Sequence, residues 1–341
     1  MKRLRVLLLT DEDLVPPEHH EGDDYTGEPW RMEYDVQLTL RGLGHDVRTL
    51  GVATDLGAIE QVRRDWRPHI AFNLLEDVYR VIPYDHNMVA FLELLGLAYT
   101  GCNPLGLLLS RDKALTKKLL AYHRIRVPRF MVCRRGRKIR RPRRLAFPLI
   151  VKPLAVHGSE GISKQSVVYD DASLAERVAF IHGHVDSDAI VEQFIPGREF
   201  YVGVLGNQRL EVFPPWELLI EQWPEGTPLV ATRKVKSDDA YQKKMQVTTR
   251  VAENLPEGLL ERIARTSRRI YRILHLSGYA RLDFRLADSG LAYLLEANPN
   301  PQLAYGEDFA ESAEHVGLAY PQLVQRILNL GLRWRQAHGL G

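Results

Sequence analysis

The sequence predicts an α/β protein that is divided into more than one domain. Its 341 residues exceed what a single ordinary hydrophobic core organises. The first hundred residues alternate short strand and helix patterns, which is typical of a parallel sheet flanked by helices. From Ile190 onward strand patterns dominate, so the later part of the chain is expected to be α+β.

The N-terminal segment, 1–108, is expected to have a Rossmann-like β-α-β-α-β layout. Met32 and Val36 recur at helical spacing before the stop signal Gly44. The predicted strands are 6–9, 47–50 and 70–74, and the predicted helices are 31–43, 55–66 and one ending at 95. Acidic residues at 11–13 follow the first strand, where a nicotinamide-binding protein has glycines. They would repel a pyrophosphate, so we exclude a nicotinamide site here.

Two further segments are expected at 109–197 and 198–335. The third contains a hairpin around Gly206-Asn207, a long helix, a second hairpin and a final helix. The predicted helices are 112–122, 257–275 and 321–335, and the predicted strands are 127–133, 148–153, 202–205, 209–213, 279–286 and 291–298.

Composition limits the compartment and the ligand class. Two cysteines without CxxC spacing indicate neither a disulfide framework nor structural zinc. The apolar run after the basic N-terminus is too short for a signal peptide, and no window approaches the ~20 apolar residues of a membrane span. We therefore expect a cytoplasmic protein with no membrane partner. The net charge of +3 alone gives no indication of nucleic-acid binding.

The hairpin at 279–298 has the most informative polar pattern. Strand alternation places Arg281, Asp283 and Arg285 on one face of the first strand, and Glu296 and Asn298 on one face of the second. We expect Asp283 opposite Glu296, and Arg281 opposite Asn298. Facing carboxylates repel unless a cation lies between them, and with an amide oxygen they suit Mg²⁺ bound together with phosphates. The alternative is an exposed polar face whose arginines neutralise the acids.

Three other segments have residues that suit a nucleotide. Lys152 leaves an apolar strand before the small-residue loop 157–162, and Lys113 begins a helix. Ammonium and backbone N–H groups placed in this way can surround phosphates. The segment 191–200 runs from an apolar strand into a loop with paired acids, which could hold an adenine and a ribose. Each also has an ordinary interpretation as a flexible loop, a surface lysine or a strand end.

A basic stretch at 134–144 supports an alternative from another class. It holds eight basic residues in eleven, which could give sequence-independent contacts to RNA or to an acidic partner. No aromatic residue interleaves with them, so base stacking is absent, and a solvated loop in the central segment is the favoured explanation of the stretch. A third interpretation is a ligase whose peptide or protein substrate docks on this loop.

Taken in order, five segments resemble the motifs of the ATP-grasp superfamily, specifically its D-alanine–D-alanine ligase-like branch. The segments are 96–101, 111–117, 150–153, 192–200 and Arg281-Leu-Asp-Phe together with 295–301. The resemblance implies a three-domain ATP-grasp fold, and five motifs in the correct order are specific. It assigns 1–108 to a pre-ATP-grasp domain, 109–197 to a central subdomain with a glycine-rich flap, and 198–335 to a C-terminal subdomain with a magnesium site.

The resemblance also implies nucleotide-binding roles. Lys113 and Lys152 match the lysines that contact the ATP phosphates. The loop 157–162 matches the glycine-rich flap, in which His157 and Gly158 would bind the nucleotide and Ser159 is a candidate catalytic residue. Glu192 matches the adenine-pocket acid and Glu199 the ribose-binding carboxylate. The hinge residues that read the base match Phe194 and Ile195.

The remaining roles that the resemblance implies concern catalysis. Asp283, Glu296 and Asn298 match the ligands of two Mg²⁺ ions, for which Mn²⁺ could substitute. Arg281 matches the arginine that stabilises the acyl-phosphate and the tetrahedral intermediate. Lys234 matches a lysine near the γ-phosphate, with Lys236 as its competitor. The implied reaction joins a carboxylate to an amine through an acyl-phosphate, with ADP and phosphate as products, and a homodimer is usual for the family.

The substrate end departs from the family pattern. Residues 10–33 lack a Gly-Gly-x-Ser-x-Glu segment, and Leu75-Glu76-Asp77 replaces a His-Gly pair. Acids of this longer loop, among them Glu28 and Glu33, could meet a substrate ammonium. The turn at 299–304 also differs from the usual Thr-Ser-Pro-Gly-Met-Thr. We therefore expect another amino acid, peptide or polyamine as substrate, with a true D-alanine–D-alanine ligase as the alternative.

Overall fold

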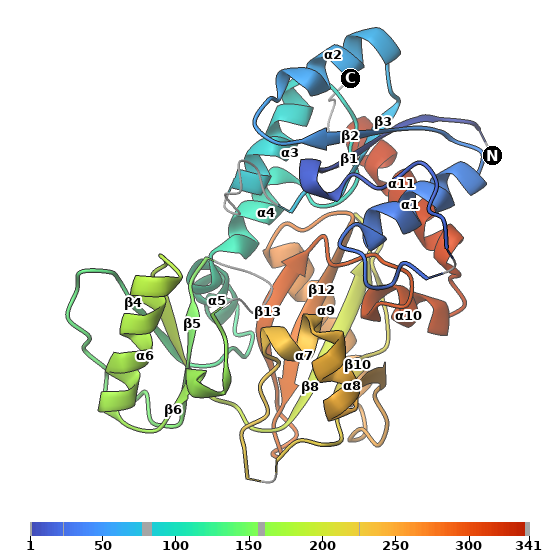
Figure 1. Ribbon diagram of the computed structural model, residues 1–341. Coiled ribbons are helices and arrows are strands. Elements are labelled where there is room, and N and C mark those ends of the chain that lie inside the picture. Colours follow the sequence, from blue (N-terminus) through green and yellow to red (C-terminus); the bar gives the residue numbers. More distant parts are fainter. Residues whose placement is uncertain (1, 23, 77–83, 156–160, 225, 338–341) are drawn as a thin grey trace.

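The computed structural model describes residues 2–22, 24–76, 84–155, 161–224 and 226–337. Three β-sheets organise this part of the chain, one within each of the three predicted segments (Figure 1). The predicted flap residues His157, Gly158 and Ser159 lie outside the described residues. No described helix is long and apolar enough to cross a membrane.

The first sheet is parallel, as the N-terminal pattern predicts. Strand β1 (Arg5–Asp11) lies between β2 (Asp46–Val52) and β3 (Ile70–Asn73). The helices of this segment are α1 (Arg31–Gly42), α2 (Gly57–Trp66), α3 (Asp85–Leu94) and α4 (Pro104–Arg111). The order of elements confirms the predicted β-α-β-α-β layout. Helix α4 is additional: Asn103 accepts a hydrogen bond from the Gly106 N–H, and proline occupies the first turn, which are ordinary helix-start signals.

The last helix returns to this first sheet. Helix α11 (Tyr320–Ala337) follows α10 (Asp308–His315) and lies near α1 in Figure 1. Its Val324 and Leu328 belong to the same buried apolar cluster as Val6 and Phe72. Because burial of apolar surface is the main stabilising contribution to folding, the C-terminal helix helps to stabilise the N-terminal sheet.

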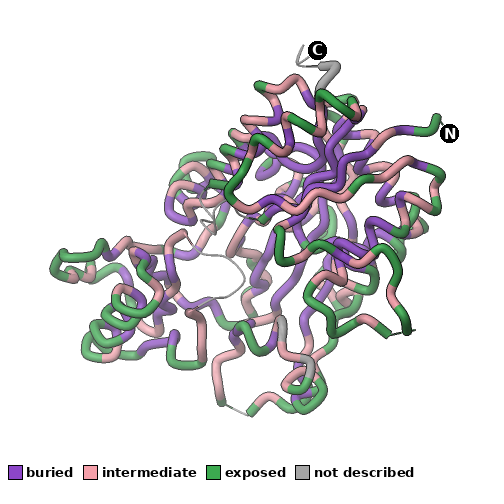
Figure 2. Tube along the Cα trace, turned by 45° about the horizontal axis from the view of Figure 1, so that its top comes forward, coloured by how far each residue is buried: buried purple, intermediate pink, exposed green. Residues whose placement is uncertain are grey.

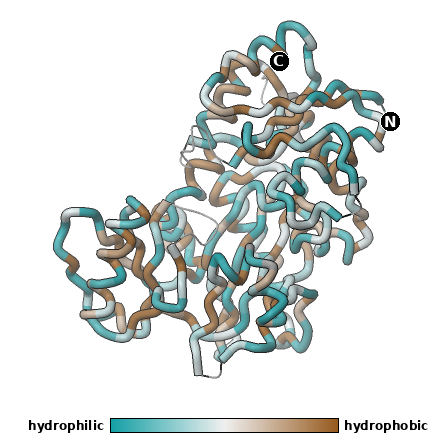
Figure 3. The backbone as a smooth tube through the Cα atoms, in the orientation of Figure 1, coloured by the Kyte–Doolittle hydropathy of each residue, from teal (hydrophilic) through white to brown (hydrophobic). Residues whose placement is uncertain are grey.

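The central sheet is antiparallel and has the strand order β4-β7-β5-β6. These strands are β4 (Phe130–Cys133), β5 (Leu149–Pro153), β6 (Val167–Val168) and β7 (Ala189–Gln193), and α5 (Lys113–Tyr122) leads into them. Helix α6 (Asp171–His184) packs Leu174 and Val178 against Val151 and Val191. The basic stretch lies in the β4–β5 connection, where most of its side chains are exposed; this loop is strongly hydrophilic in Figure 3.

The third sheet has the strand order β11-β10-β8-β12-β13, with β9 paired to β8. Its strands are β8 (Arg198–Leu205), β9 (Glu211–Val212), β10 (Trp216–Ile220), β11 (Val247–Val251), β12 (Tyr279–Leu286) and β13 (Ala292–Pro299). On one face α9 (Leu259–Ile273) buries Ile263 and Ile270 with Val202. On the other, α7 (Arg233–Ser237) and α8 (Asp239–Met245) add Val235 and Met245 to a cluster with Tyr201. Figure 2 shows buried residues following the sheet strands.

Candidate active site

The β12–β13 hairpin brings the predicted metal-binding residues together. Asp283 pairs with Glu296, and Arg281 pairs with Asn298, which confirms the register expected from strand alternation. A register irregularity follows between Asp283 and Phe284. The two carboxylates are therefore held by adjacent strands of one sheet, where side-chain directions are fixed by the pleat.

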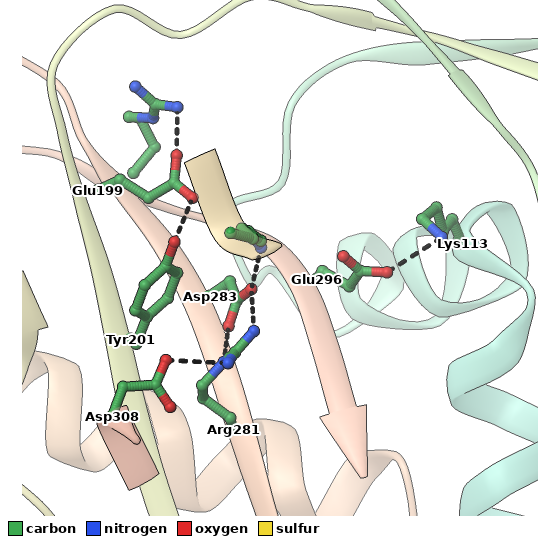
Figure 4. A network of polar contacts seen from close by, with 9 residues as sticks. Lys113, Glu199, Tyr201, Arg281, Asp283, Glu296 and Asp308 are labelled. Atoms are coloured by element: carbon green, nitrogen blue, oxygen red, sulfur yellow. Dashed lines mark hydrogen bonds and ion pairs between the residues drawn. The ribbon is translucent and has the colours of Figure 1, made fainter. Parts of the chain in front are cut away.

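Basic groups lie against both carboxylates (Figure 4). The Arg281 Nε donates to Asp283 Oδ1 over 2.9 Å, and the same guanidinium contacts Asp308 Oδ2 over 2.9 Å. The Lys236 Nζ lies 3.9 Å from Asp283 Oδ2, and the Lys113 Nζ lies 3.0 Å from Glu296 Oε1. Burial raises the pKa of Asp283, although Arg281 and Lys236 oppose that rise. Arg281 thus neutralises Asp283, as the alternative interpretation of the hairpin expects, and it does so beside the predicted metal ligands.

A cleft joins the central segment to this hairpin. Lys113, Lys152 and Ile162 line it from the central segment, while Glu199, Asp283 and Glu296 line it from the third sheet; Lys236 and Arg285 complete its charged lining. Two predicted phosphate-binding lysines and two predicted metal-binding acids therefore share one space. Opposite charges arranged around a cleft can accept a polyanion together with its counter-cation.

Glu192 is more constrained than the sequence suggests. It is 1% exposed, and its carboxylate lies 3.2 Å from the Lys117 Nζ and 3.0 Å from the Lys152 Nζ. Burial alone would raise the pKa of Glu192, but the two ammonium groups outweigh it and lower that pKa. Burial likewise opposes the charge of Lys152, yet Glu192 raises its pKa. Glu192 therefore keeps Lys152 charged and fixed at the edge of the cleft.

Lys117 is a residue that the sequence analysis did not single out. It is 2% exposed, and its Nζ donates to the Leu295 carbonyl over 2.5 Å. It thereby links α5 to the β12–β13 hairpin. The sequence feature that could have identified Lys117 is its spacing from Lys113, because residues four apart lie on one face of a helix.

The predicted ribose-binding acid is held from two sides. The Arg285 Nη2 donates to Glu199 Oε2 over 2.5 Å, and the Tyr201 hydroxyl donates to Glu199 Oε1 over 3.2 Å. Arg285 stands opposite Glu199 in the β12–β8 pairing. Arg285 thus pairs with an acid on the neighbouring strand β8 rather than within the hairpin. This ion pair orients the Glu199 carboxylate at the wall of the cleft.

The remaining predicted residues occupy different positions. Phe194 and Ile195 are buried in the connection from β7 to β8, and Phe194 packs with Ile150. Lys234 is exposed on α7, whereas Lys236 lines the cleft. The geometry therefore favours Lys236 over Lys234 as the group that faces a phosphate.

A second cavity of about 680 Å³ continues from Arg281 toward the N-terminal segment. It is lined by Glu28, Arg31 and Glu307, among others, and Arg31 lies 3.4 Å from Glu307. Arg31 also donates to the Tyr305 carbonyl. The long N-terminal loop and the turn after β13 thus meet at one space beside Arg281, which is a suitable position for substrates.

Comparison with known proteins relates the chain to one family. Residues 119–329 match the family model described as D-ala D-ala ligase C-terminus. The uncharacterized protein y4sG of Sinorhizobium fredii is 31% identical over 323 residues, covering 92% of each chain. The D-alanine–D-alanine ligase of Syntrophotalea carbinolica is 34% identical, covering 72% of this chain and 73% of its own. The crystal structure of Bacillus anthracis D-alanine–D-alanine ligase complexed with ATP matches with a TM-score of 0.75 at 22% identity, covering 98% of this chain and 100% of that one; at this identity the likeness concerns the fold.

Proposed function

Because this chain belongs to the D-alanine–D-alanine ligase family of the ATP-grasp superfamily, we propose that it activates a carboxylate as an acyl-phosphate and joins it to an amine. Family membership confirms the predicted resemblance, the mixed α/β ATP-grasp fold class and the class of ATP-dependent ligases that form carbon–nitrogen bonds. One observation supports the mechanism most directly. Lys113 and Lys152 line the same cleft as Asp283 and Glu296.

In this proposal the cleft binds ATP. Lys113, Lys152 and Lys236 offset the phosphate charge, so that a second anion, the substrate carboxylate, can approach the γ-phosphoryl group. Glu199 is oriented to accept hydrogen bonds from ribose hydroxyls. The backbone at Phe194 and Ile195 would contact the base. Glu192 acts mainly through Lys152, since both of its oxygens already face ammonium groups.

Asp283, Glu296 and Asn298 would hold Mg²⁺. Two facing carboxylates and an amide form a hard-oxygen set, and Mg²⁺ is commonly bound by one or two carboxylates plus phosphates and water. The buried Asn298 Nδ2 has no hydrogen-bond partner among the described residues, so this N–H group is available to donate to a phosphate oxygen while the amide oxygen would face the metal. Bound metal would supply charge stabilisation for phosphoryl transfer. We propose two ions, with Mn²⁺ as a substitute.

Arg281 is positioned for the second half of the reaction. Asp283 and Asp308 hold its guanidinium in one orientation, and together they outweigh burial and raise its pKa well above the ordinary value. A buried, permanently charged donor can stabilise the oxyanion that forms when the amine attacks the acyl-phosphate. The amine must attack as the neutral form, and its nitrogen then loses a proton as the phosphate leaves.

We propose an amino acid, peptide or other amine as substrate in place of D-alanine, with a true D-alanine–D-alanine ligase as the alternative. The acidic 10–33 loop and the turn after β13 support this choice, since both line the substrate side. Membership of the ligase family disfavours the RNA-binding alternative. A docking role for the 134–144 loop, a homodimer and a cytoplasmic location remain proposals. The two free, buried cysteines are compatible with a reducing compartment.

The decisive experiment measures ADP release with Mg²⁺ against panels of amino acids, dipeptides and diamines. Lys152→Ala should lower ATP affinity at least tenfold, because it removes a phosphate contact and leaves Glu192 with one cation fewer. Circular dichroism must show that the variant stays folded, and Lys234→Ala is the matched control on an exposed lysine. Absence of ATP binding to the wild type at millimolar Mg²⁺ would refute the proposed function.

A further inference from the structure

A surface cavity of about 480 Å³ lies at the amino end of β3, beside the C-terminal end of α2. Three arginines, one proline and two residues of the turn after α3 line it: Arg63, Arg64, Arg67, Pro68, Gly96 and Leu97. No acid is among these described lining residues. Three guanidinium groups around one space create a positive potential that attracts anions. We call this space the basic cavity.

Arg63 carries a donor that the protein itself leaves unsatisfied. Its Nε is buried and has no hydrogen-bond partner among the described residues, and the side chain lines the basic cavity. Buried N–H groups without a partner are rare in folded proteins, and one beside a cavity is a donor for a bound water or ion. An anion in the basic cavity would supply the missing acceptor.

The residues around the cavity compensate only one of the three lining charges. Arg64 pairs with Glu60 over 2.7 Å on the exposed side of α2. Arg63 and Arg67 have no ion-pair partner in the part of the chain that the structure describes. The Arg67 carbonyl also accepts hydrogen bonds from the Arg5 Nε over 2.9 Å and from its Nη2 over 2.7 Å. This contact brings a further guanidinium to the same end of the sheet, so two uncompensated charges remain for a ligand.

The positive potential extends beyond the lining residues. The Arg48 guanidinium on β2 lies over the Trp66 ring of α2, 4.6 Å from its centroid. Burial lowers the pKa of His69, directly before β3, and the charges of Arg5 and Lys2 lower it further. Nearby positive charge disfavours protonation of a histidine. This shift therefore reports the same potential from a neighbouring group.

Stabilisation of the helix end does not account for the whole arrangement. Arg63 and Arg64 lie in the last turn of α2, where basic residues interact favourably with the helix dipole. Arginines with only that role could extend into solvent. It requires neither a cavity lined by three guanidinium groups nor a buried N–H group without a partner, and both features point to a ligand.

The basic cavity is separate from the catalytic region. Arg5, which contacts Arg67, is the first residue of β1, whereas Asp11 is the last. Seven residues of β1 at ~3.3 Å each separate these ends by roughly 20 Å. Glu76, beyond the carboxyl end of β3, lines the 680 Å³ cavity that contains Arg281, and no described residue lines both that cavity and the basic cavity. Figure 1 likewise shows α2 at the end of the N-terminal segment that is far from the third sheet.

We propose that the basic cavity binds a small organic dianion, either a phosphate monoester or a dicarboxylate. Arginine forms paired, charge-assisted hydrogen bonds with both kinds of group. The volume of about 480 Å³ falls in the ~300–1,000 Å³ range of small-molecule sites, so there is room for a carbon skeleton beside the anionic group. Pro68 and Leu97 provide an apolar wall for it. This inference goes beyond the proposed ligase function and does not depend on it.

Calorimetry on the intact protein tests the proposal with two probe pairs, glycerol 3-phosphate against glycerol and succinate against succinamide. ADP and Mg²⁺ are kept in excess, so that no probe occupies the proposed nucleotide cleft. We expect saturable binding of the anionic member of at least one pair and of neither neutral member. Arg63→Gln should weaken that binding about tenfold, the effect of losing a charge-assisted hydrogen bond. Arg63→Lys keeps the charge but lacks the Nε donor, and it should weaken binding less.

Arg265→Gln is the matched control, because it removes one exposed arginine charge from α9, outside the basic cavity. It should leave the affinity unchanged. If Arg63→Gln fails to fold, Arg67→Gln replaces it with the same expectation. Binding of only one anion identifies its chemical group as the preferred one and supports the proposal.

Three results would overturn the inference. The first is the absence of saturable binding of both anions to the wild type. The second is undiminished binding by a folded Arg63→Gln variant. The third is an equal loss of affinity in Arg63→Gln and Arg265→Gln, which would indicate attraction to the overall charge of the protein rather than a site.

Discussion

Glu33→Gln should make the protein more stable at alkaline pH and leave it nearly unchanged at acidic pH. Without ligand, burial raises the pKa of Glu33 from 4.5 to about 7 in the folded protein. The folded state therefore holds its proton at pH values where the unfolded state has released it. Stability is then lost as pH rises from the unfolded pKa through the folded one, because the unfolded state binds fewer protons. From pH 5 to pH 8 this loss amounts to about 2–3 kcal/mol, at ~1.4 kcal/mol per pKa unit.

The assay is urea unfolding of both proteins at pH 5 and pH 8, without substrate. The quantity of interest is the change with pH in the difference between their free energies of unfolding, since other titrating groups contribute equally to both. The free-energy cost of burying the glutamine amide in the variant does not depend on pH, so it also cancels when the two pH values are compared. If the stability difference is the same at both pH values, Glu33 does not titrate abnormally, and its carboxylate is solvated or paired.

Two other substitutions test the cleft. Glu296→Gln should abolish most activity and the thermal shift caused by Mg²⁺. It should change metal-free stability by less than about 1 kcal/mol, because loss of the ion pair with Lys113 is offset by removal of the repulsion between Glu296 and Asp283 on the facing strand; a large loss of metal-free stability would instead indicate a structural ion pair. Glu192→Gln should destabilise the fold by about 3–5 kcal/mol in urea unfolding, because Lys117 and Lys152 would be left buried without their counter-charge; a stability equal to that of the wild type would contradict this reading of the cluster.

The hairpin shows which parts of a site can be predicted from sequence. Alternation along a strand fixes which side chains share a face, and the short turn fixes the register, so Asp283 and Glu296 could be placed opposite each other before the structure was known. Both rules are local. The same holds for the N-terminal strands and helices, whose apolar periodicity and glycine stop signals lie within a few residues of each element.

Contacts between segments distant in the chain could not be predicted in this way. Asp308, which orients Arg281, begins a helix beyond the hairpin. Arg285 finds Glu199 only because β12 pairs with β8. Lys117 and Glu192 meet because α5 packs beside the central sheet. Each depends on how separate elements pack, which single-sequence patterns do not specify.

The partners of the buried charges distinguish the two ends of the site. At the nucleotide end, Glu192, Glu199 and Asp283 each have a basic partner within the protein, so the positions of Lys152 and Arg281 are set before any ligand binds. Preorganised charges of this kind avoid reorganisation during the reaction. In the N-terminal segment, the buried Glu33 has no basic partner among the residues that the structure describes. Reaction chemistry requires a fixed geometry, whereas specificity is a difference in affinity between candidate ligands; the preorganised charges of the β12–β13 hairpin meet the first requirement, as the proposed function demands.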